Sequence, residues 1–162
     1  KALVGGLMGL LPDDERLTHA LEIAKEAGFN YRFAVEEEAG SQPNLVRFDI
    51  RNADEGAHMS VTRGYIGGGN IVVTRINNTA LHISRKYNTV VVDHLDKPGA
   101  VLSVAKILAD SGVNIANMNM YRQGKRSRAY MILETDEKIT PDVLKTLRRL
   151  DDMYVIYIPK LY

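Results

Sequence analysis

A histidine and an aspartate stand on either side of one leucine in the run VVVDHLDKPGAVL, immediately before a proline and a glycine. These residues are His94 and Asp96, and the run predicts a strand, a polar turn and then a helix. The first backbone N–H groups of a helix lack intrahelical partners, so they can hold a carboxylate. A side-chain carboxylate can pair with an ammonium group. Because an amino acid carries both groups, we expect an amino-acid-binding site at this turn.

The turn needs a strand before it and a helix after it. Residues 89–95 are rich in β-branched side chains, which is typical of a strand. From Ala100 onwards apolar side chains recur at helical spacing, and Gly112 can supply the left-handed position that ends the helix. Residues 114–121 alternate again as a second strand, and the basic run 122–128 follows as a solvated hairpin tip rather than a phosphate-binding patch.

The same reading continues to the end of the chain. Ala129–Glu134 is a third strand, Thr140-Pro141 is an N-cap followed by proline in the first helical turn, and Tyr154–Ile158 is a fourth strand. The order βαββαβ predicts a ferredoxin-like, four-stranded antiparallel sheet with both helices on one face.

The first half is less regular. Acidic residues after Pro12 predict a helix start, and further strands are expected at 31–35, 46–50, 58–65, 71–76 and 79–87. The fold class is therefore α+β, with one partial α+β domain at 1–86 and a βαββαβ domain at 87–162. The chain begins with Lys1 and an apolar stretch, which suggests a piece of a longer protein.

Composition narrows the classes of function. A formal net charge of +1 gives no reason to expect nucleic acid or a membrane surface as a partner, and no apolar run approaches the ~20 residues that cross a bilayer. The chain has no cysteine, so it cannot by itself hold an iron–sulfur cluster through thiolates. We also expect no metal site and no catalytic residue in this chain, and a cytoplasmic location.

The segment 90–119 resembles the ACT domain, a regulatory module that binds amino acids at subunit interfaces. The opening run KALVGGLMGLLPDDERLTHALEIAKEAG and the later IGGGNI resemble the β subunit of iron–sulfur-dependent L-serine dehydratase, in which a substrate-binding-like domain precedes an ACT domain. The resemblance implies part of an enzyme that converts L-serine to pyruvate and ammonia. A [4Fe–4S] cluster is then expected in a partner catalytic α subunit or domain, and this chain alone is expected to be non-catalytic.

The resemblance also implies an effector, most simply L-serine, bound between two ACT domains of a homo-oligomer. The effector-binding residues are then His94, Asp96, Pro98, Gly99, Ala100, Val101 and Asn114.

Simpler roles remain open for these residues. Asp96 can cap the following helix and His94 can pack on the sheet, while Asn114 suits a turn equally well. Gly67–Gly69 favours a hairpin tip over the alternative, a site where the backbone approaches a carboxylate.

Two other functions compete with the dehydratase. The same pair of domains occurs in some D-3-phosphoglycerate dehydrogenases, where it would serve feedback regulation, and a free-standing amino-acid sensor is the third possibility. The neighbouring reading frames would distinguish the three functions. A cysteine-bearing α chain would support the dehydratase, a fused dinucleotide-binding domain would support the dehydrogenase, and the lack of both would support the sensor.

Overall fold

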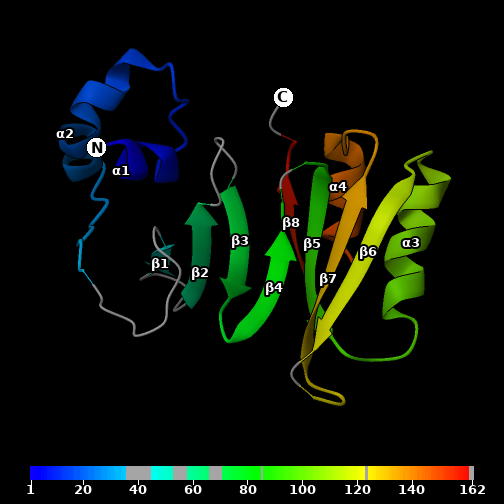
Figure 1. Cartoon of the computed structure of the whole chain (residues 1–162). Helices are drawn as coiled ribbons and strands as arrows, with labels where there is room; N and C mark the ends of the chain where they lie inside the picture. Colours follow the sequence, from blue (N-terminus) through cyan, green and yellow to red (C-terminus); the bar gives the residue numbers. More distant parts are fainter. Residues whose placement is uncertain (36–44, 53–57, 66–70, 85, 123, 161–162) are drawn as a thin grey trace. The chain divides into compact units, whose positions relative to one another are not determined.

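A computed structural model describes residues 1–35, 45–52, 58–65, 71–84, 86–122 and 124–160 (Figure 1). The chain divides into two compact units between residues 40 and 41. The domain boundary predicted between residues 86 and 87 lies within the second unit, in the connection between its two sheets. The assignment of two sequence domains, 1–86 and 87–162, stays a prediction.

The first unit is helical. It contains α1 (Ala2–Leu7), the 3-10 helix η1 (Glu15–His19) and α2 (Ala20–Glu26). The helix expected after Pro12 thus begins as a 3-10 turn, and Asp14 caps it by accepting a hydrogen bond from the backbone N–H of Arg16 at 2.9 Å. A side chain at Gly5 would collide with Leu17, so this glycine allows α1 to pack closely against the following turn.

The strand predicted at 31–35 is wrong. These residues pair with no strand in the described part of the chain, and Tyr31, Phe33 and Val35 are exposed. The rings of Tyr31 and Phe33 stack edge to face with centroids 5.7 Å apart. Alternating aromatic residues favour a strand only where a neighbouring strand supplies the hydrogen bonds.

The second unit opens with a four-stranded antiparallel meander. Its strands are β1 (Leu45–Arg51), β2 (His58–Tyr65), β3 (Ile71–Ile76) and β4 (Thr79–Ile83). Three of the four expected strands are confirmed almost to the residue, and the fourth ends at Ile83 rather than Tyr87. Gly67–Gly69 lies outside the described residues.

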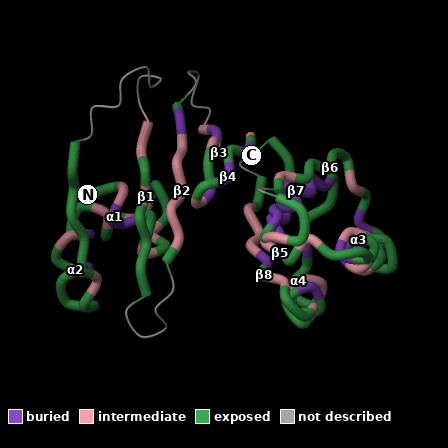
Figure 2. The backbone as a smooth tube through the Cα atoms, turned by 90° about the horizontal axis from the view of Figure 1, so that it is seen from below, coloured by how far each residue is buried: buried purple, intermediate pink, exposed green. Residues whose placement is uncertain are grey.

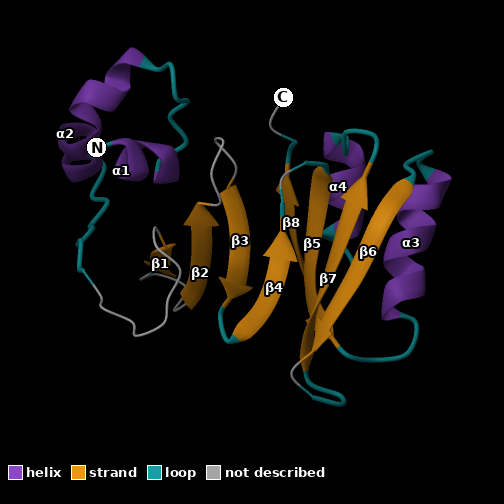
Figure 3. Ribbon diagram, in the orientation of Figure 1, coloured by secondary structure: helices purple, strands orange, loops and turns teal. Residues whose placement is uncertain are grey.

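The βαββαβ module follows and confirms the ferredoxin-like prediction (Figure 3). Its strand order is β6-β7-β5-β8, with every neighbouring pair antiparallel. The elements are β5 (Asn88–Leu95), α3 (Ala100–Asp110), β6 (Ile115–Arg122), β7 (Arg128–Thr135), α4 (Pro141–Leu147) and β8 (Met153–Ile158).

The predicted helix boundaries are also present. Gly112 adopts a φ of 70°, the backbone N–H of Val113 donates to the carbonyl of Leu108 at 2.9 Å, and the Thr140 side chain caps α4. None of the helices in the described part of the chain is long and apolar enough to cross a membrane.

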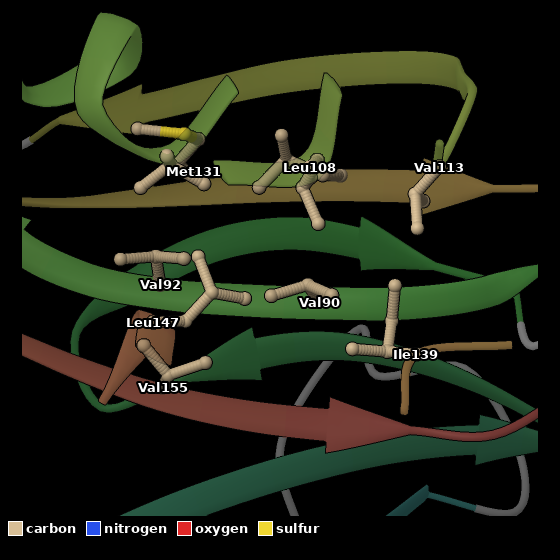
Figure 4. Close-up of a cluster of buried hydrophobic side chains, with 10 residues drawn as sticks. Val90, Val92, Leu108, Val113, Met131, Ile139, Leu147 and Val155 are labelled. Atoms are coloured by element: carbon tan, nitrogen blue, oxygen red, sulfur yellow. The ribbon is translucent and has the colours of Figure 1, made fainter. Parts of the chain in front are cut away.

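Both helices cover one face of the module's sheet, and they form its core there (Figure 4). The buried side chains of this core are Val90, Val92, Val104, Leu108, Val113, Met131, Leu133, Ile139, Leu147 and Val155.

The opposite face of the same sheet packs against β3 and β4 of the meander. That second core holds Ile76, Leu81, Ile83, Val91, Tyr130 and Ile132. The central strands β5 and β7 are therefore buried along nearly their whole length, whereas β6 is mostly exposed (Figure 2).

A polar contact joins the two sheets beside this second core. Asn77, in the turn between β3 and β4, donates from Nδ2 to the Tyr130 hydroxyl at 2.9 Å. Burial raises the pKa of Tyr130, and the Asn77 hydrogen bond opposes that shift.

Replacing Leu108 with alanine should lower the free energy of unfolding by about 2–5 kcal/mol, since it leaves a cavity under α3. Leu102 lies on the same helix but is 69% exposed, whereas Leu108 is fully buried. Leu102→Ala is therefore the matched control and should cost less than about 0.5 kcal/mol. Urea denaturation measures both, and similar losses would contradict the placement of α3.

Candidate functional site

The turn between β5 and α3 brings a proline, a glycine and the first backbone amides of α3 together. Gly99 occupies the N-cap position of α3 with a φ of 88°, where an L side chain would be strained. Among the described residues no side chain caps this helix, and Ala100 behind the turn is buried. The N–H of Ala100 donates to the carbonyl of Lys97 at 3.3 Å, and that of Ser103 donates to the carbonyl of Gly99 at 2.9 Å. Within the described residues the N–H groups of Val101 and Leu102 are thus left for a carboxylate, and the site at this turn stays a prediction.

Asp96 is held by the β6–β7 connection and does not cap the helix. Its Oδ2 accepts hydrogen bonds from Arg122 Nη1 at 3.2 Å and from the backbone N–H of Arg126 at 3.3 Å. Its own N–H donates to the carbonyl of Ser127 at 2.8 Å. The capping role left open for Asp96 is therefore wrong. Within the described residues its second carboxylate oxygen, Oδ1, accepts no hydrogen bond.

The neighbouring Lys97 fixes the turn from its other side. Its ammonium group donates to Asp152 Oδ2 at 2.7 Å, and this contact holds the pKa of Asp152 below its usual value. Asp152 directly precedes β8, so both edges of the module contribute to positioning the turn.

His94 is 1% exposed and lies on the helix-covered face of the sheet, level with Ala129 of β7 and Met153 of β8. Arg122 of β6 is also level with Ala129, so His94 and Arg122 share one row on that face. Nδ1 of His94 lies 2.8 Å from the carbonyl oxygen of Leu95, which can only accept. Nε2 is buried and has no hydrogen-bond partner among the residues that the structure describes. In the neutral ring Nε2 is consequently an unsatisfied acceptor.

Asn114 lies at the far end of α3 from this turn. Its Nδ2 donates to Asp136 Oδ2 at 2.6 Å, and its backbone N–H donates to Glu137 Oε2 at 2.7 Å. The 11 residues of α3 separate Asn114 from Gly99 by about 16 Å along the helix axis. One chain therefore brings together the residues between His94 and Val101 but not Asn114.

Sequence reasoning missed Arg122 as a partner of Asp96 and the two acids that hold Asn114. Arg122 was read as part of a solvated tip, although strand alternation places it on the same face as Met118 and Met120. The two acids gave no signal, because Asp136 and Glu137 are more than 20 residues away in sequence. In the described part of the chain no group of three or more histidine, aspartate or glutamate side chains is placed to hold a metal ion.

Comparison with known proteins adds two findings. The ACT domain family model matches residues 88–152. The chain is 32% identical over 152 residues to a probable L-serine dehydratase β chain of Bacillus subtilis, covering 94% of this chain and 68% of that one. It is 30% identical over 141 residues to the L-serine dehydratase β chain of Peptoniphilus asaccharolyticus, covering 86% and 63%. The chain thus spans about two thirds of the length of these relatives.

A more distant similarity involves a different enzyme. The D-3-phosphoglycerate dehydrogenase of Bacillus subtilis is 25% identical over 154 residues, which are 94% of this chain and 29% of that protein.

The His94 geometry predicts its tautomer. In the neutral ring the proton should reside on Nδ1, because the Leu95 carbonyl needs a donor there. Long-range ¹H–¹⁵N spectra of the histidine side chains distinguish the two nitrogens. Exposed His82 provides an internal control, since free imidazoles ordinarily favour the Nε2–H form. An Nε2–H signal for His94 would contradict the assignment.

Proposed function

This chain belongs to the family of L-serine dehydratase β chains, and we propose that it is the regulatory, amino-acid-binding part of such an enzyme. In this proposal the assembled enzyme converts L-serine to pyruvate and ammonia. The observation that carries it is the match of nearly the whole chain to two dehydratase β chains, together with an ACT domain at 88–152.

The catalytic chemistry belongs to a partner in this proposal. A [4Fe–4S] cluster is bound through cysteine thiolates, and this chain has none, so its own residues do not fit such a cluster. The cluster is assigned to a catalytic α subunit or domain, and the 162-residue chain alone is expected to be inactive.

The effector, for which L-serine is the first candidate, is proposed to bind at the turn before α3. Its carboxylate meets the N–H groups of Val101 and Leu102 in the first turn of α3, and its ammonium group meets Asp96 Oδ1, because Oδ2 is already occupied. The unsatisfied Nε2 of His94 offers an acceptor to a hydroxyl group such as that of serine, provided that a small rearrangement uncovers it.

Asn114 enters this site only from a second copy of the chain. Strand β6 is an edge of the sheet, and Met118 and Met120 are exposed on the face that the helices cover. An antiparallel pairing of two β6 edges would place Asn114 of one chain near the α3 turn of the other. We therefore propose a homo-oligomer formed through β6 and α3.

One observation favours a second candidate. The 25% identity to a D-3-phosphoglycerate dehydrogenase extends over 94% of the chain, so the same unit would serve as the regulatory region of that enzyme. A free-standing amino-acid sensor is the third possibility. The genes on either side of the coding sequence distinguish these alternatives.

Calorimetric titration with L-serine tests the site. Asp96→Ala should weaken binding by about 1.5–3 kcal/mol, the range for a hydrogen bond to a charged group. Asp136 is unsuitable as the control because it holds Asn114. Asp110→Ala is better, since Asp110 is an exposed α3 carboxylate whose one partner among the described residues is Lys106, and the change should alter affinity little. Equal affinities for the Asp96 and Asp110 variants would show that the site is misplaced.

Sedimentation tests the oligomer. Met118 is 44% exposed on β6, and Met118→Lys should shift the chain to monomer by placing a charge in the paired surface. Tyr154→Lys alters an exposed residue of β8, the opposite edge of the same sheet, and should leave association unchanged. A wild-type chain that stays monomeric at high micromolar concentration would rule out the proposal.

A further inference from the structure

We propose that the meander of the second unit carries a separate binding pocket for a small organic monocarboxylate, with Arg63 as the group that receives the carboxylate. The pocket lies at the end of β1, β2 and β3 and has a volume of about 690 Å³. Its described lining residues are Leu45, Val46, Arg63, Gly64, Tyr65 and Ile71. It shares no residue with the α3 turn.

Among the described residues the guanidinium group of Arg63 has no counter-ion. Its Nε is enclosed by protein and has no hydrogen-bond partner, and the described residues place no carboxylate in an ion pair with it. Asp49 of β1 is the acid on the facing strand, but Asp49 receives Arg47 Nε at 3.0 Å. Partly buried charges are normally paired, so an unpaired guanidinium lining a pocket points to an anion from outside the chain.

The local backbone supports this assignment. The pairing of β2 with β3 shifts register between Thr62 and Arg63, and such irregularities re-aim side chains next to binding sites. Gly64 follows directly, and a buried glycine within a strand leaves room for a close approach. The guanidinium carbon of Arg63 lies 5.6 Å from the centre of the Phe48 ring, which fixes the position of the charge.

The lining selects the class of anion. Arg63 is the one cationic side chain among the described residues of the pocket. Its single positive charge balances the charge of a monocarboxylate but not the two negative charges of a phosphate dianion. Leu45, Val46 and Ile71 supply apolar walls, which favour a carboxylate with a short hydrocarbon part. A guanidinium group binds a carboxylate through two parallel hydrogen bonds.

The test uses the full 162-residue chain, with propionate and inorganic phosphate as probes at constant ionic strength. Propionate should shift the Arg63 Nε–H resonance, and Arg63→Gln should weaken its binding roughly 10- to 100-fold, as expected for a lost charge-assisted hydrogen bond. Arg75→Gln removes an exposed cation from β3 of the same sheet and should leave propionate affinity unchanged.

Arg63→Lys keeps the positive charge but loses the two parallel N–H donors, so this variant should bind propionate with intermediate affinity. It replaces Arg63→Gln as the test variant if Arg63→Gln does not fold. No propionate-dependent shift, equal affinity of the Arg63 and Arg75 variants, or tighter binding of phosphate would each overturn the proposal. Asp96→Ala should retain propionate binding, so failure of the serine site and failure of this pocket are distinguishable.

Discussion

The burial of β5 and β7 on both faces is the constraint on which the second unit depends. On one face Val90, Val92 and Met131 meet the two helices, and on the other Val91 and Ile132 meet β3 and β4. A strand covered on both sides cannot slip by one residue without exchanging its two sets of contacts. The register of these strands therefore places His94 under the helix layer and Asp93 on the opposite face.

The position of β6 at the edge of the sheet depends on the same burial of β5 and β7. It pairs with β7 on one side only, and its outer side is free of strands in the described part of the chain. Its pairing to β7 brings Arg122 to the turn before α3, where it meets Asp96, and it carries Asn114 to the opposite end of the helix. In the two-chain site that we propose, Arg122 at the end of β6 and Asn114 directly before β6 would lie at opposite ends, so a single chain would leave that site divided.

Strong local signals made much of the module predictable. The change from alternating to helical spacing after residue 99, the glycine at 112 and the Thr140-Pro141 cap each act within a few residues, and all three appear as expected. The α3 turn was predictable for the same reason. The prediction of a strand at 31–35 was wrong because strand pairing depends on a partner that these residues do not encode. The prediction of a hairpin tip at Gly67–Gly69 lies outside the described residues.

The sequence by itself determined the order of elements, the position of the α3 turn and the absence of thiolate ligands, since each depends on short-range periodicity or on composition. Tertiary structure alone decided which groups Asp96 and Asn114 contact, because Arg122 and Asp136 reach them only after strands far apart in sequence have paired. It also decided that β3 and β4 cover the second face of the sheet and that Arg63 has no counter-ion within the part of the chain that the structure describes. These features arise from long-range packing, which no local pattern records.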